Sequence, residues 1–251
     1  MLIQEILFTP GTKLSGGTEK AGSSVVGQDL GTFVGARPAG VAATTDAPAL
    51  FGASDVIIDF TSPAITMVNA ELAAATGKAL VIGTTGLDDV ARAAIALAAK
   101  KTVIVQAPNM SVGVNALLAL TERLAKTLSD DYDIEIVEMH HSAKVDAPSG
   151  TALGLGEAAA KGRGKKLDDV ARRARDGQVG ARPKGEIGFA TLRGGDVVGD
   201  HTVIFATQGE RVELTHKASS RDIFAKGAVR AALWCKGRAP GLYSMRDVLG
   251  L

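Results

Sequence analysis

This sequence has little cysteine and few aromatic side chains. One of its 251 residues is a cysteine, Cys235, so the chain can form no internal disulfide and no cysteine-based zinc site. Aromatic residues make up 4% of the chain, which leaves few rings for stacking against single-stranded nucleic acid. We therefore expect a protein of a reducing compartment that does not depend on disulfides or on base stacking.

The chain also lacks a dominant charge and a long apolar run. Its 28 basic and 27 acidic side chains give a net charge of +1, so no overall field attracts DNA or a membrane surface. No apolar segment approaches the ~20 residues needed to cross a bilayer, and segment 1–8 has no basic flank of a signal peptide. We expect a soluble, cytoplasmic protein with no nucleic-acid partner and no membrane partner.

Strands and helices alternate from residue 54 to about residue 128. Ser62 and Pro63 form a typical helix start between two apolar runs. Continuous apolar strands that alternate with helices indicate a parallel sheet covered on both faces, and ligands bind beyond the carboxyl ends of such strands. The loops 83–86 and 107–111 are expected there. Three apolar runs of strand length carry this prediction: 55–60, 79–83 and 102–106.

After residue 130 the pattern changes to longer segments in which polar and apolar residues alternate. Such alternation is typical of antiparallel strands with one wet face. We therefore predict a second domain of the α+β class with a mostly antiparallel or mixed sheet, following a parallel α/β domain. The expected strands are 133–139, 186–192, 196–207 and 211–216, and the expected helices are 151–160 and 221–236.

The first fifty residues contain no strong strand, although 1–8 reads as part of a helix. A doubly wound domain normally opens with a strand and a glycine-rich phosphate turn, and neither is visible here. The thirty glycines include one nominal G-x-G-x-x-A match at 154–159, but it follows a turn rather than a strand. We interpret it as small residues that allow helix packing.

The segment 138–151 (EMHHSAKVDAPSGT) is the richest in chemically active side chains. It contains His140, His141, Lys144 and a Ser-Gly-Thr turn into a helix. Histidine suits proton transfer near neutral pH, and a helix start offers N–H groups to an anion. The segment favours a site for a carboxylate-bearing substrate that takes up a proton. A capped surface loop is the alternative, and a metal site is less favoured because no third ligand accompanies the histidine pair.

Other segments rich in polar side chains can be explained without a functional role. The segment 216–221 (HKASSR) reads equally as a basic site or as a capped helix start. The stretch 161–184 holds nine basic and three acidic side chains and reads as a solvated loop rather than a nucleic-acid patch. His201 and Trp234 are expected to be structural.

These residues together resemble one family. Segment 138–151 is similar to the defining motif of the 4-hydroxy-tetrahydrodipicolinate reductases, also called dihydrodipicolinate reductases, of bacterial lysine and diaminopimelate biosynthesis. The similarity covers nearly the whole chain. It extends through 59–61 (DFT), 81–86 (VIGTTG), 107–113 (APNMSVG), 187–199 (IGFATLRGGDVVG), 209–221 (GERVELTHKASSR) and 245–249 (MRDVL).

The resemblance implies an NADH- or NADPH-dependent oxidoreductase. Members of the family reduce 4-hydroxy-tetrahydrodipicolinate, a small dicarboxylate, to tetrahydrodipicolinate with loss of water. The implied fold is a Rossmann-like nucleotide-binding domain in residues 1–111 and 221–251, and a substrate-binding and tetramerisation domain in residues 112–220. A homotetramer is the implied assembly.

The resemblance also assigns roles by position. His140 would be the proton donor and Lys144 a second catalytic residue, with no metal. The implied substrate contacts are His141, Ser149, Gly150 and Thr151. The implied cofactor contacts are Gly83, Thr84, Thr85, Ala107, Pro108, Asn109 and Met110, with Glu19 and Lys20 at the adenosine ribose. An acid at that ribose commonly selects NAD and a base tolerates a 2′-phosphate, so the pair does not decide between NADH and NADPH.

The sequence departs from the family pattern at its start. The family opens with a strand and a G-x-x-G-R-M-G turn, and residues 2–5 of this sequence match the interior of the helix that follows them. We therefore expect the first strand of the Rossmann-like sheet and its phosphate turn to be missing, with neighbouring strand edges left unpaired. A coding start placed too late is one explanation. The other is a truncated, cofactor-binding-deficient homologue that acts only as an oligomer subunit or is inactive. A cofactor-free hydro-lyase built on His140 and Lys144 is a weaker third reading.

Overall fold

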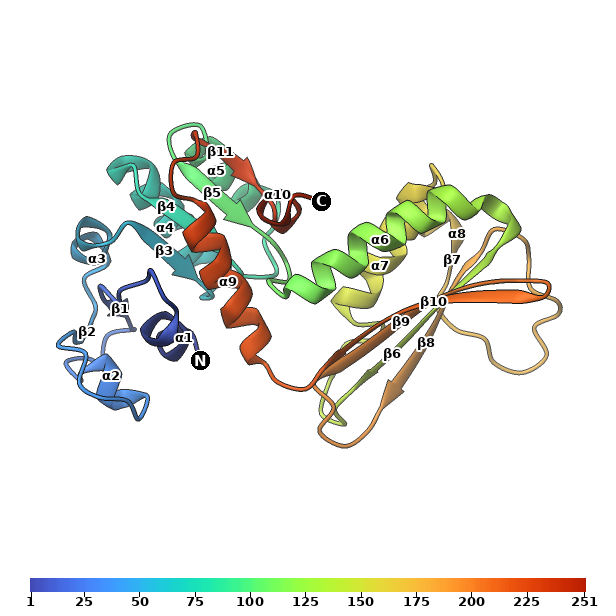
Figure 1. The fold of residues 1–251 in the computed structure, drawn as a ribbon, viewed down its shortest axis with the longest axis horizontal. Helices are drawn as coiled ribbons and strands as arrows, with labels where there is room; N and C mark the ends of the chain where they lie inside the picture. Colours follow the sequence, from blue (N-terminus) through green and yellow to red (C-terminus); the bar gives the residue numbers. More distant parts are fainter. The chain divides into compact units, whose positions relative to one another are not determined.

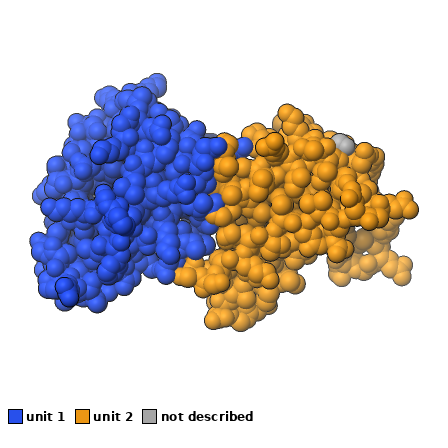
Figure 2. All heavy atoms as spheres, viewed as in Figure 1, with its two compact units in different colours: residues 1–112, 222–250 blue, residues 113–221, 251 orange. Residues whose placement is uncertain are grey.

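The computed structural model describes the backbone of residues 1–251 and every side chain except that of Ser129. The chain divides into two compact units (Figure 2). Unit 1 consists of residues 1–112 and 222–250, and unit 2 consists of residues 113–221 and Leu251. The C-terminal segment thus returns to the unit that the N-terminal segment begins.

Unit 1 is built on a four-stranded parallel sheet in the order β11-β5-β4-β3 (Figure 1). Three of its strands lie within the apolar runs that the sequence predicts, whereas β11 was not predicted. The strands are β3 (Val56–Asp59), β4 (Ala79–Ile82), β5 (Val103–Gln106) and β11 (Gly241–Tyr243). The helices around it are α4 (Pro63–Thr76), α5 (Asp89–Ala98), α9 (Asp222–Trp234) and α10 (Met245–Leu249).

Helix-start and helix-end residues set where these helices begin and stop. Pro63 lies in the first turn of α4, and Gly77 ends that helix in the left-handed conformation with φ 68°. The Asp88 carboxylate accepts a hydrogen bond from the Ala91 N–H at 2.8 Å and caps α5. A cap of this type stabilises a helix by about 1 kcal/mol. The two loops at the carboxyl ends of β4 and β5 are therefore bounded by stable helices.

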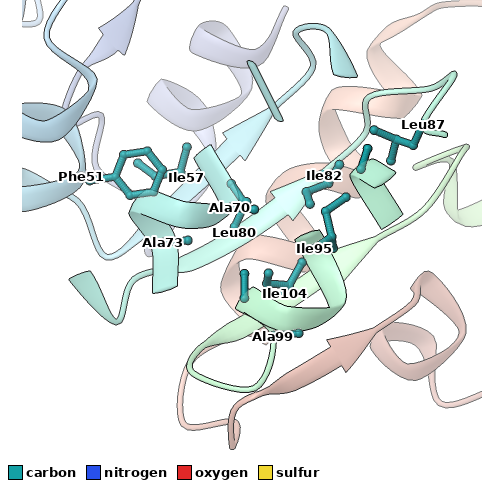
Figure 3. Packing of buried hydrophobic residues seen from close by; sticks show 12 residues of the cluster. Phe51, Ile57, Ala70, Ala73, Leu80, Ile82, Leu87, Ile95, Ala99 and Ile104 are labelled. Atoms are coloured by element: carbon teal, nitrogen blue, oxygen red, sulfur yellow. The ribbon is translucent and has the colours of Figure 1, made fainter. Parts of the chain in front are cut away.

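The sheet of unit 1 is buried on both faces, which explains the uninterrupted apolar runs. Leu80 and Ile82 of β4 pack among residues of α4 and α5 on one face (Figure 3). Val81 lies between them and faces the other way, where it packs with Ala228 and Ala231 of α9. Alternating side chains of one strand therefore enter two different cores, and the prediction of a covered parallel sheet is confirmed.

The first fifty residues form a small layer of their own around Leu14, Leu30 and Ala43. Residues 1–8 are helical, as the sequence predicts, and the strands here are two residues long. The elements are α1 (Leu2–Phe8), β1 (Gly17–Thr18), α2 (Leu30–Phe33), β2 (Ala43–Thr44) and α3 (Ala47–Ala53). Strands β1 and β2 pair in parallel as a separate two-stranded sheet.

A cavity of about 1190 Å³ lies in unit 1 and is lined by both β1 and β3. Among the described residues, β3 pairs only with β4 and β1 only with β2, so each strand has one edge without a ladder. Helices α1, α3 and α9 contribute further lining residues. Unit 1 therefore contains two separate parallel sheets, β1-β2 and β11-β5-β4-β3.

Unit 2 contains a five-stranded mixed sheet in the order β10-β9-β6-β8-β7, as the sequence predicts. Its strands are β6 (Asp133–His140), β7 (Ala171–Arg172), β8 (Ile187–Arg193), β9 (Gly199–Thr207) and β10 (Glu210–Ala218). Its helical segments are α6 (Val112–Leu128), η1 (Ser129–Asp131), α7 (Gly150–Gly162) and α8 (Leu167–Val170). Ile134 and Ile136 of β6 pack against α7 through Leu155, so one face of the sheet carries the core.

The structure corrects one expectation for unit 2, on the stretch 161–184, and explains another, on the glycines at 154–159. The stretch 161–184 is not simply a solvated loop, because it contains α8 and β7 and its arginines are bound. Arg175 and Arg182 both pair with Glu135, at 2.9 Å each, so they hold the stretch against β6. The nominal dinucleotide motif lies inside α7, where a Cβ on Gly156 would come within 2.5 Å of the Phe189 ring. Glycine there allows close helix–sheet packing.

Candidate active site

Strand β6 ends in two residues that face the buried side of the sheet. The strand alternates between half-buried and buried positions, and both Glu138 and His140 fall on the buried set. A strand places residues i and i+2 on one face, so the Glu138 carboxylate and the His140 imidazole are neighbours on the same face of the sheet. Glu138 is 1% exposed and His140 is 8% exposed. The site therefore begins with a buried acid and a histidine at its rim.

Glu138 uses both carboxylate oxygens. Its Oε2 lies 2.6 Å from Nδ1 of His140 and accepts a bond from Arg193 at 2.8 Å. Its Oε1 accepts from the second Arg193 nitrogen at 2.9 Å and from the Ser149 N–H at 3.1 Å. A bidentate arginine–carboxylate pair is among the stronger protein hydrogen-bond arrangements. Four donors therefore hold the Glu138 carboxylate in one orientation.

These donors decide the charge of Glu138. Burial is the largest single influence and raises the pKa, because it disfavours the charged form. The hydrogen bonds from Arg193, His140 and the Ser149 N–H together outweigh burial, so the Glu138 pKa lies below its usual value. At neutral pH the site therefore contains a carboxylate anion beneath His140.

Ser149 connects this network to a helix and to a second histidine. Its Oγ caps α7 by accepting from the Ala152 N–H at 3.1 Å, and it lies 3.0 Å from Nε2 of His201 on β9. The rings of His140 and His201 meet edge to face with centroids 5.0 Å apart. Burial, with a smaller contribution from His140, lowers the His201 pKa to about 4. His201 is therefore neutral at physiological pH.

The remaining expected residues of segment 138–151 surround this network. The Lys144 ammonium pairs with the Asp146 carboxylate at 2.7 Å, and this bond chiefly lowers the Asp146 pKa. The Asp146 carbonyl in turn accepts from Arg193 at 2.7 Å, which ties Lys144 to the Glu138 cluster. His141 is half-buried and its carbonyl accepts the Lys144 N–H at 3.1 Å. Gly150 and Thr151 begin α7, directly after Ser149.

The expected cofactor residues of unit 1 follow two adjacent parallel strands. Gly83, Thr84 and Thr85 follow β4, and the segment Ala107–Met110 follows β5. The Ala107 N–H donates to the Ile82 carbonyl at 3.1 Å, so the two loops start side by side. This is the sheet edge at which ligands bind in parallel α/β folds.

Packing fixes the conformation of both loops. The Thr84 hydroxyl is buried beside the Thr66 hydroxyl at 2.9 Å, whereas Thr85 is exposed. A Cβ on Gly83 would overlap the Phe60 ring, and a Cβ on Gly227 of α9 would overlap the Met110 carbonyl oxygen. Glycine is therefore needed at both positions to let another part of the chain approach closely.

Glu19 and Lys20 lie immediately after β1 and are exposed. The Glu19 N–H donates to the Thr44 carbonyl at 2.9 Å, which extends the pairing of β1 with β2 by one residue. The Glu19 carboxylate accepts the Lys20 N–H at 2.8 Å, and Glu19 also lines the cavity between β1 and β3. The structure therefore places the pair on the small layer of unit 1, separate from the β4 and β5 loops in the chain.

Sequence reasoning did not single out three residues of the unit 2 network. Glu138 was within the quoted motif, and its i, i+2 spacing from His140 on an alternating strand was a usable signal. Arg193 and His201 gave no such signal, because only strand pairing brings them in. Arg193 is paired with His140 across β6 and β8, and His201 with Glu138 across β6 and β9.

The described residues form neither a candidate metal site nor a membrane-spanning helix. Within the part of the chain that the structure describes, no group of three or more His, Cys, Asp or Glu residues could hold a metal ion. No helix formed by the described residues is both long enough and apolar enough to cross a membrane.

The parallel α/β unit has loops beyond β4 and β5, and the mixed-sheet unit has a histidine on a buried carboxylate, so the chain is a two-domain protein with a Rossmann-like unit. Family models match almost the whole chain: "Dihydrodipicolinate reductase, N-terminus" over residues 1–110 and "Dihydrodipicolinate reductase, C-terminus" over residues 113–249. The chain belongs to the dihydrodipicolinate reductase family.

Individual relatives agree with this assignment. The chain is 57% identical over 251 residues to a 4-hydroxy-tetrahydrodipicolinate reductase from Methylocella silvestris, covering 100% of this chain and 92% of the relative. It is also 57% identical to the enzyme of that name from Parvibaculum lavamentivorans, covering 93% of the relative. Among solved structures it resembles a dipicolinate-bound dihydrodipicolinate reductase from Paenisporosarcina sp. TG-14, with a TM-score of 0.73 and 22% identity over 98% of this chain and 92% of that one.

Proposed function

We propose that this chain reduces 4-hydroxy-tetrahydrodipicolinate to tetrahydrodipicolinate in an NAD(P)H-dependent reaction of lysine and diaminopimelate biosynthesis. The observation that carries this proposal is the placement of His140 on the Glu138 carboxylate, which also accepts the Ser149 N–H at the start of α7, with Lys144 in the loop that follows β6. The reaction adds one hydride and one proton to the substrate and releases its hydroxyl oxygen as water. It therefore needs a proton donor, and relatives of this name match the chain over its full length.

His140 is the proton donor in this proposal, and Lys144 is the second catalytic residue. Imidazole exchanges a proton near neutral pH, and the Lys144 ammonium supplies positive charge against the negative charge that develops in the substrate. The Asp146 carboxylate at 2.7 Å keeps the ammonium in place until substrate binds. The chain's own residues thus hold both the proton and the compensating charge in unit 2.

His141, Ser149, Gly150 and Thr151 are the proposed substrate contacts. The substrate is a dicarboxylate, and the N–H groups at the start of α7 favour an anion through the helix dipole. The structural relative from Paenisporosarcina sp. TG-14 was solved with dipicolinate, also a dicarboxylate. Ser149 holds the helix start in place through its cap to Ala152 and contributes to the site mainly in that way.

NADH or NADPH supplies the hydride when bound. The loops after β4 and β5 fit such a cofactor because they lie together at the carboxyl edge of a parallel sheet and depend on close glycine packing. Gly83, Thr84, Thr85 and Ala107–Met110 are the proposed contacts of these loops. A glycine-rich phosphate turn after a strand is not among the described residues, so these loops would hold the part of the cofactor away from its pyrophosphate.

Glu19 and Lys20 are the proposed contacts for the adenosine ribose. An exposed acid after β1 suits hydrogen bonding to a ribose hydroxyl, whereas an adjacent lysine tolerates a 2′-phosphate. Because Glu19 and Lys20 are adjacent, the same site offers a partner for a ribose hydroxyl and one for a 2′-phosphate. We therefore propose that NADH and NADPH are both accepted.

We further propose that residues 1–111 and 221–251 bind the nucleotide, and that residues 112–220 bind substrate and form a homotetramer. The family resemblance implies this division of roles and this assembly. Light scattering after size exclusion tests the assembly. The expected mass is four times the 25.7 kDa chain, and a monomer would contradict it.

The activity itself is tested by mixing the purified chain with freshly generated 4-hydroxy-tetrahydrodipicolinate and either nicotinamide cofactor. We expect loss of cofactor absorbance that depends on substrate, with one tetrahydrodipicolinate formed per cofactor oxidised. Failure of both cofactors would support the inactive-subunit alternative, which the full-length match to named reductases does not favour. Product formed without any cofactor would instead identify a hydro-lyase.

A further inference from the structure

The Glu138 carboxylate has hydrogen-bond partners at all of its acceptor positions, and one of these partners is a ring nitrogen of His140. An ionised carboxylate has room for about four hydrogen bonds, and Arg193, the Ser149 N–H and His140 fill it. An ionised carboxylate only accepts hydrogen bonds, so the imidazole nitrogen 2.6 Å away must be the donor.

We propose that Glu138 is a positioning residue that keeps a hydrogen on Nδ1 of His140 and thereby makes Nε2 the nitrogen that holds and releases the reactive proton. The inference rests on the proposed role of His140 as proton donor. Arg193 contributes by donating one hydrogen bond to each Glu138 oxygen, at 2.8 and 2.9 Å, which holds the carboxylate in place. Without the carboxylate, the imidazole could turn over or carry its hydrogen on the other nitrogen.

Gly199 on β9 keeps the Nε2 edge of the ring clear. A Cβ at this position would lie 2.9 Å from Nε2 and 3.3 Å from Cδ2 of His140. Real Cβ atoms do not approach so closely, so any larger residue would displace the ring. The two ring nitrogens thus have different surroundings: a carboxylate at Nδ1 and a bare backbone at Nε2.

The charges around His140 come from four parts of unit 2. Glu138 lies on the same strand, Arg193 on β8 and His201 on β9, and Lys144 and Asp146 lie in the following loop. Burial keeps His201 neutral, so it adds no charge. Replacing Glu138 with glutamine would remove the anion that contacts the ring and leave the Arg193 and Lys144 cations. The substitution therefore changes the balance of charge at the ring, and the pH dependence of the rate reports that change.

The first test is the position of the hydrogen on the ring. Long-range ¹H–¹⁵N NMR of the chain distinguishes imidazole tautomers, and the four histidines are assigned by His→Gln replacement. We expect neutral His140 to carry its hydrogen on Nδ1 and Glu138→Gln to abolish that preference. A parent His140 with its hydrogen on Nε2 alone would overturn the proposal. This measurement needs no activity, so it separates failure of the proposal from failure of the proposed function.

The second test is kinetic. We expect Glu138→Gln to lower kcat on the order of 10²-fold and to move the alkaline limb of the pH–rate profile to lower pH. Glu138→Asp, which keeps the charge, should restore part of the rate. Glu213→Gln is the control, because Glu213 is a half-exposed strand glutamate that pairs with Arg211. It should leave kcat and the pH profile unchanged.

An unchanged pH profile in Glu138→Gln would overturn the proposal, since a purely structural role predicts a lower rate without a shifted profile. Circular dichroism establishes whether each variant folds. Should Glu138→Gln not fold, Gly199→Ala provides the kinetic test in a chain that keeps the carboxylate. Displacing the ring is expected to lower kcat at least tenfold, and full activity of that variant would contradict the assignment of Nε2.

Discussion

The two units hold their expected functional residues in different ways. In unit 2, a single carboxylate, Glu138, joins His140, Arg193 and the start of α7 through contacts of 2.6 to 3.1 Å. In unit 1, the expected cofactor residues come from three separate segments. Backbone hydrogen bonds and close glycine approaches hold them, and the Thr84 hydroxyl also bonds with Thr66 and Asp59. A cavity of about 1190 Å³ also lies beside the segment that contains Glu19.

This difference indicates how the two halves of the reaction are prepared. The proposed proton donor is held by charge-assisted hydrogen bonds, which depend on a few side chains and are sensitive to pH. The proposed nucleotide loops are held mainly by close glycine approaches, which depend on helix and sheet packing and are sensitive to added volume. Substitutions of the proposed catalytic residues in unit 2 should therefore change the chemistry, whereas substitutions in the loops of unit 1 should change stability and nucleotide affinity.

A large effect on the chemistry is expected from Lys144. Lys144→Met keeps the length of the side chain but removes the ammonium that pairs with Asp146. We expect kcat/KM for the dicarboxylate to fall on the order of 10²-fold, because a charge that assists proton transfer is lost. Calorimetric nucleotide affinity should stay the same. Lys161→Met is the control, since Lys161 is 67% exposed at the end of α7, and equal losses in both variants would contradict the prediction.

The next effect is on acid stability and comes from His201. Its folded pKa of about 4 lies below the value of 6.5 for an exposed histidine, so the unfolded chain binds this proton first. The contribution to stability is complete above pH 6.5 and is lost as pH falls toward 4, by about 3 kcal/mol. Urea unfolding at several pH values should show this loss in the parent and less of it in His201→Gln. Identical pH dependence in the two proteins would contradict the prediction.

A smaller effect tests packing in unit 1. Gly227→Ala places a Cβ against the Met110 carbonyl oxygen, so α9 and the loop after β5 must separate. We expect a loss of about 2 kcal/mol in unfolding free energy, which is typical of overpacking. Gly52→Ala is the matched control on α3, where nothing lies within 4 Å of the added Cβ, and it should not destabilise. A fully stable Gly227→Ala protein would refute this view of the loop.

Much of the fold could be predicted because its signals are local. Helix α4 was bounded by Pro63 and Gly77, and β4 was an uninterrupted apolar run. Strand β11 was missed because it is three residues long and is defined by its pairing with β5 rather than by its own sequence. Local sequence signals therefore predicted most helices and strands, whereas pairing between distant segments determined which strands complete the sheet.

The site shows the same division. His140 and Lys144 lie in one continuous motif, so the sequence could identify them as candidates. Arg193 and His201 reach the motif only through the register of β8 and β9 against β6, which no spacing along the chain reveals. The ion pairs in the stretch 161–184 were missed for a similar reason, since Arg175 and Arg182 find Glu135 only once β6 is in place.

The smallest expected effect concerns cofactor choice in unit 1. Glu19→Gln removes a carboxylate that would repel a 2′-phosphate and leaves the adjacent Lys20. We expect the ratio of kcat/KM for NADPH to that for NADH to rise about threefold to tenfold, as for loss of one exposed charge contact. The dicarboxylate KM should not change. A ratio that stays constant would remove Glu19 from the ribose site.

The central claim is that His140 in unit 2 supplies the proton for a reduction whose nucleotide is bound by unit 1. It is tested most directly by His140→Gln, with kcat for 4-hydroxy-tetrahydrodipicolinate and the calorimetric Kd for NADH measured on the same preparation. We predict that kcat falls by about 10²-fold or more while the NADH Kd is unchanged. A His140→Gln protein that reduces the substrate at the parent rate would contradict the account.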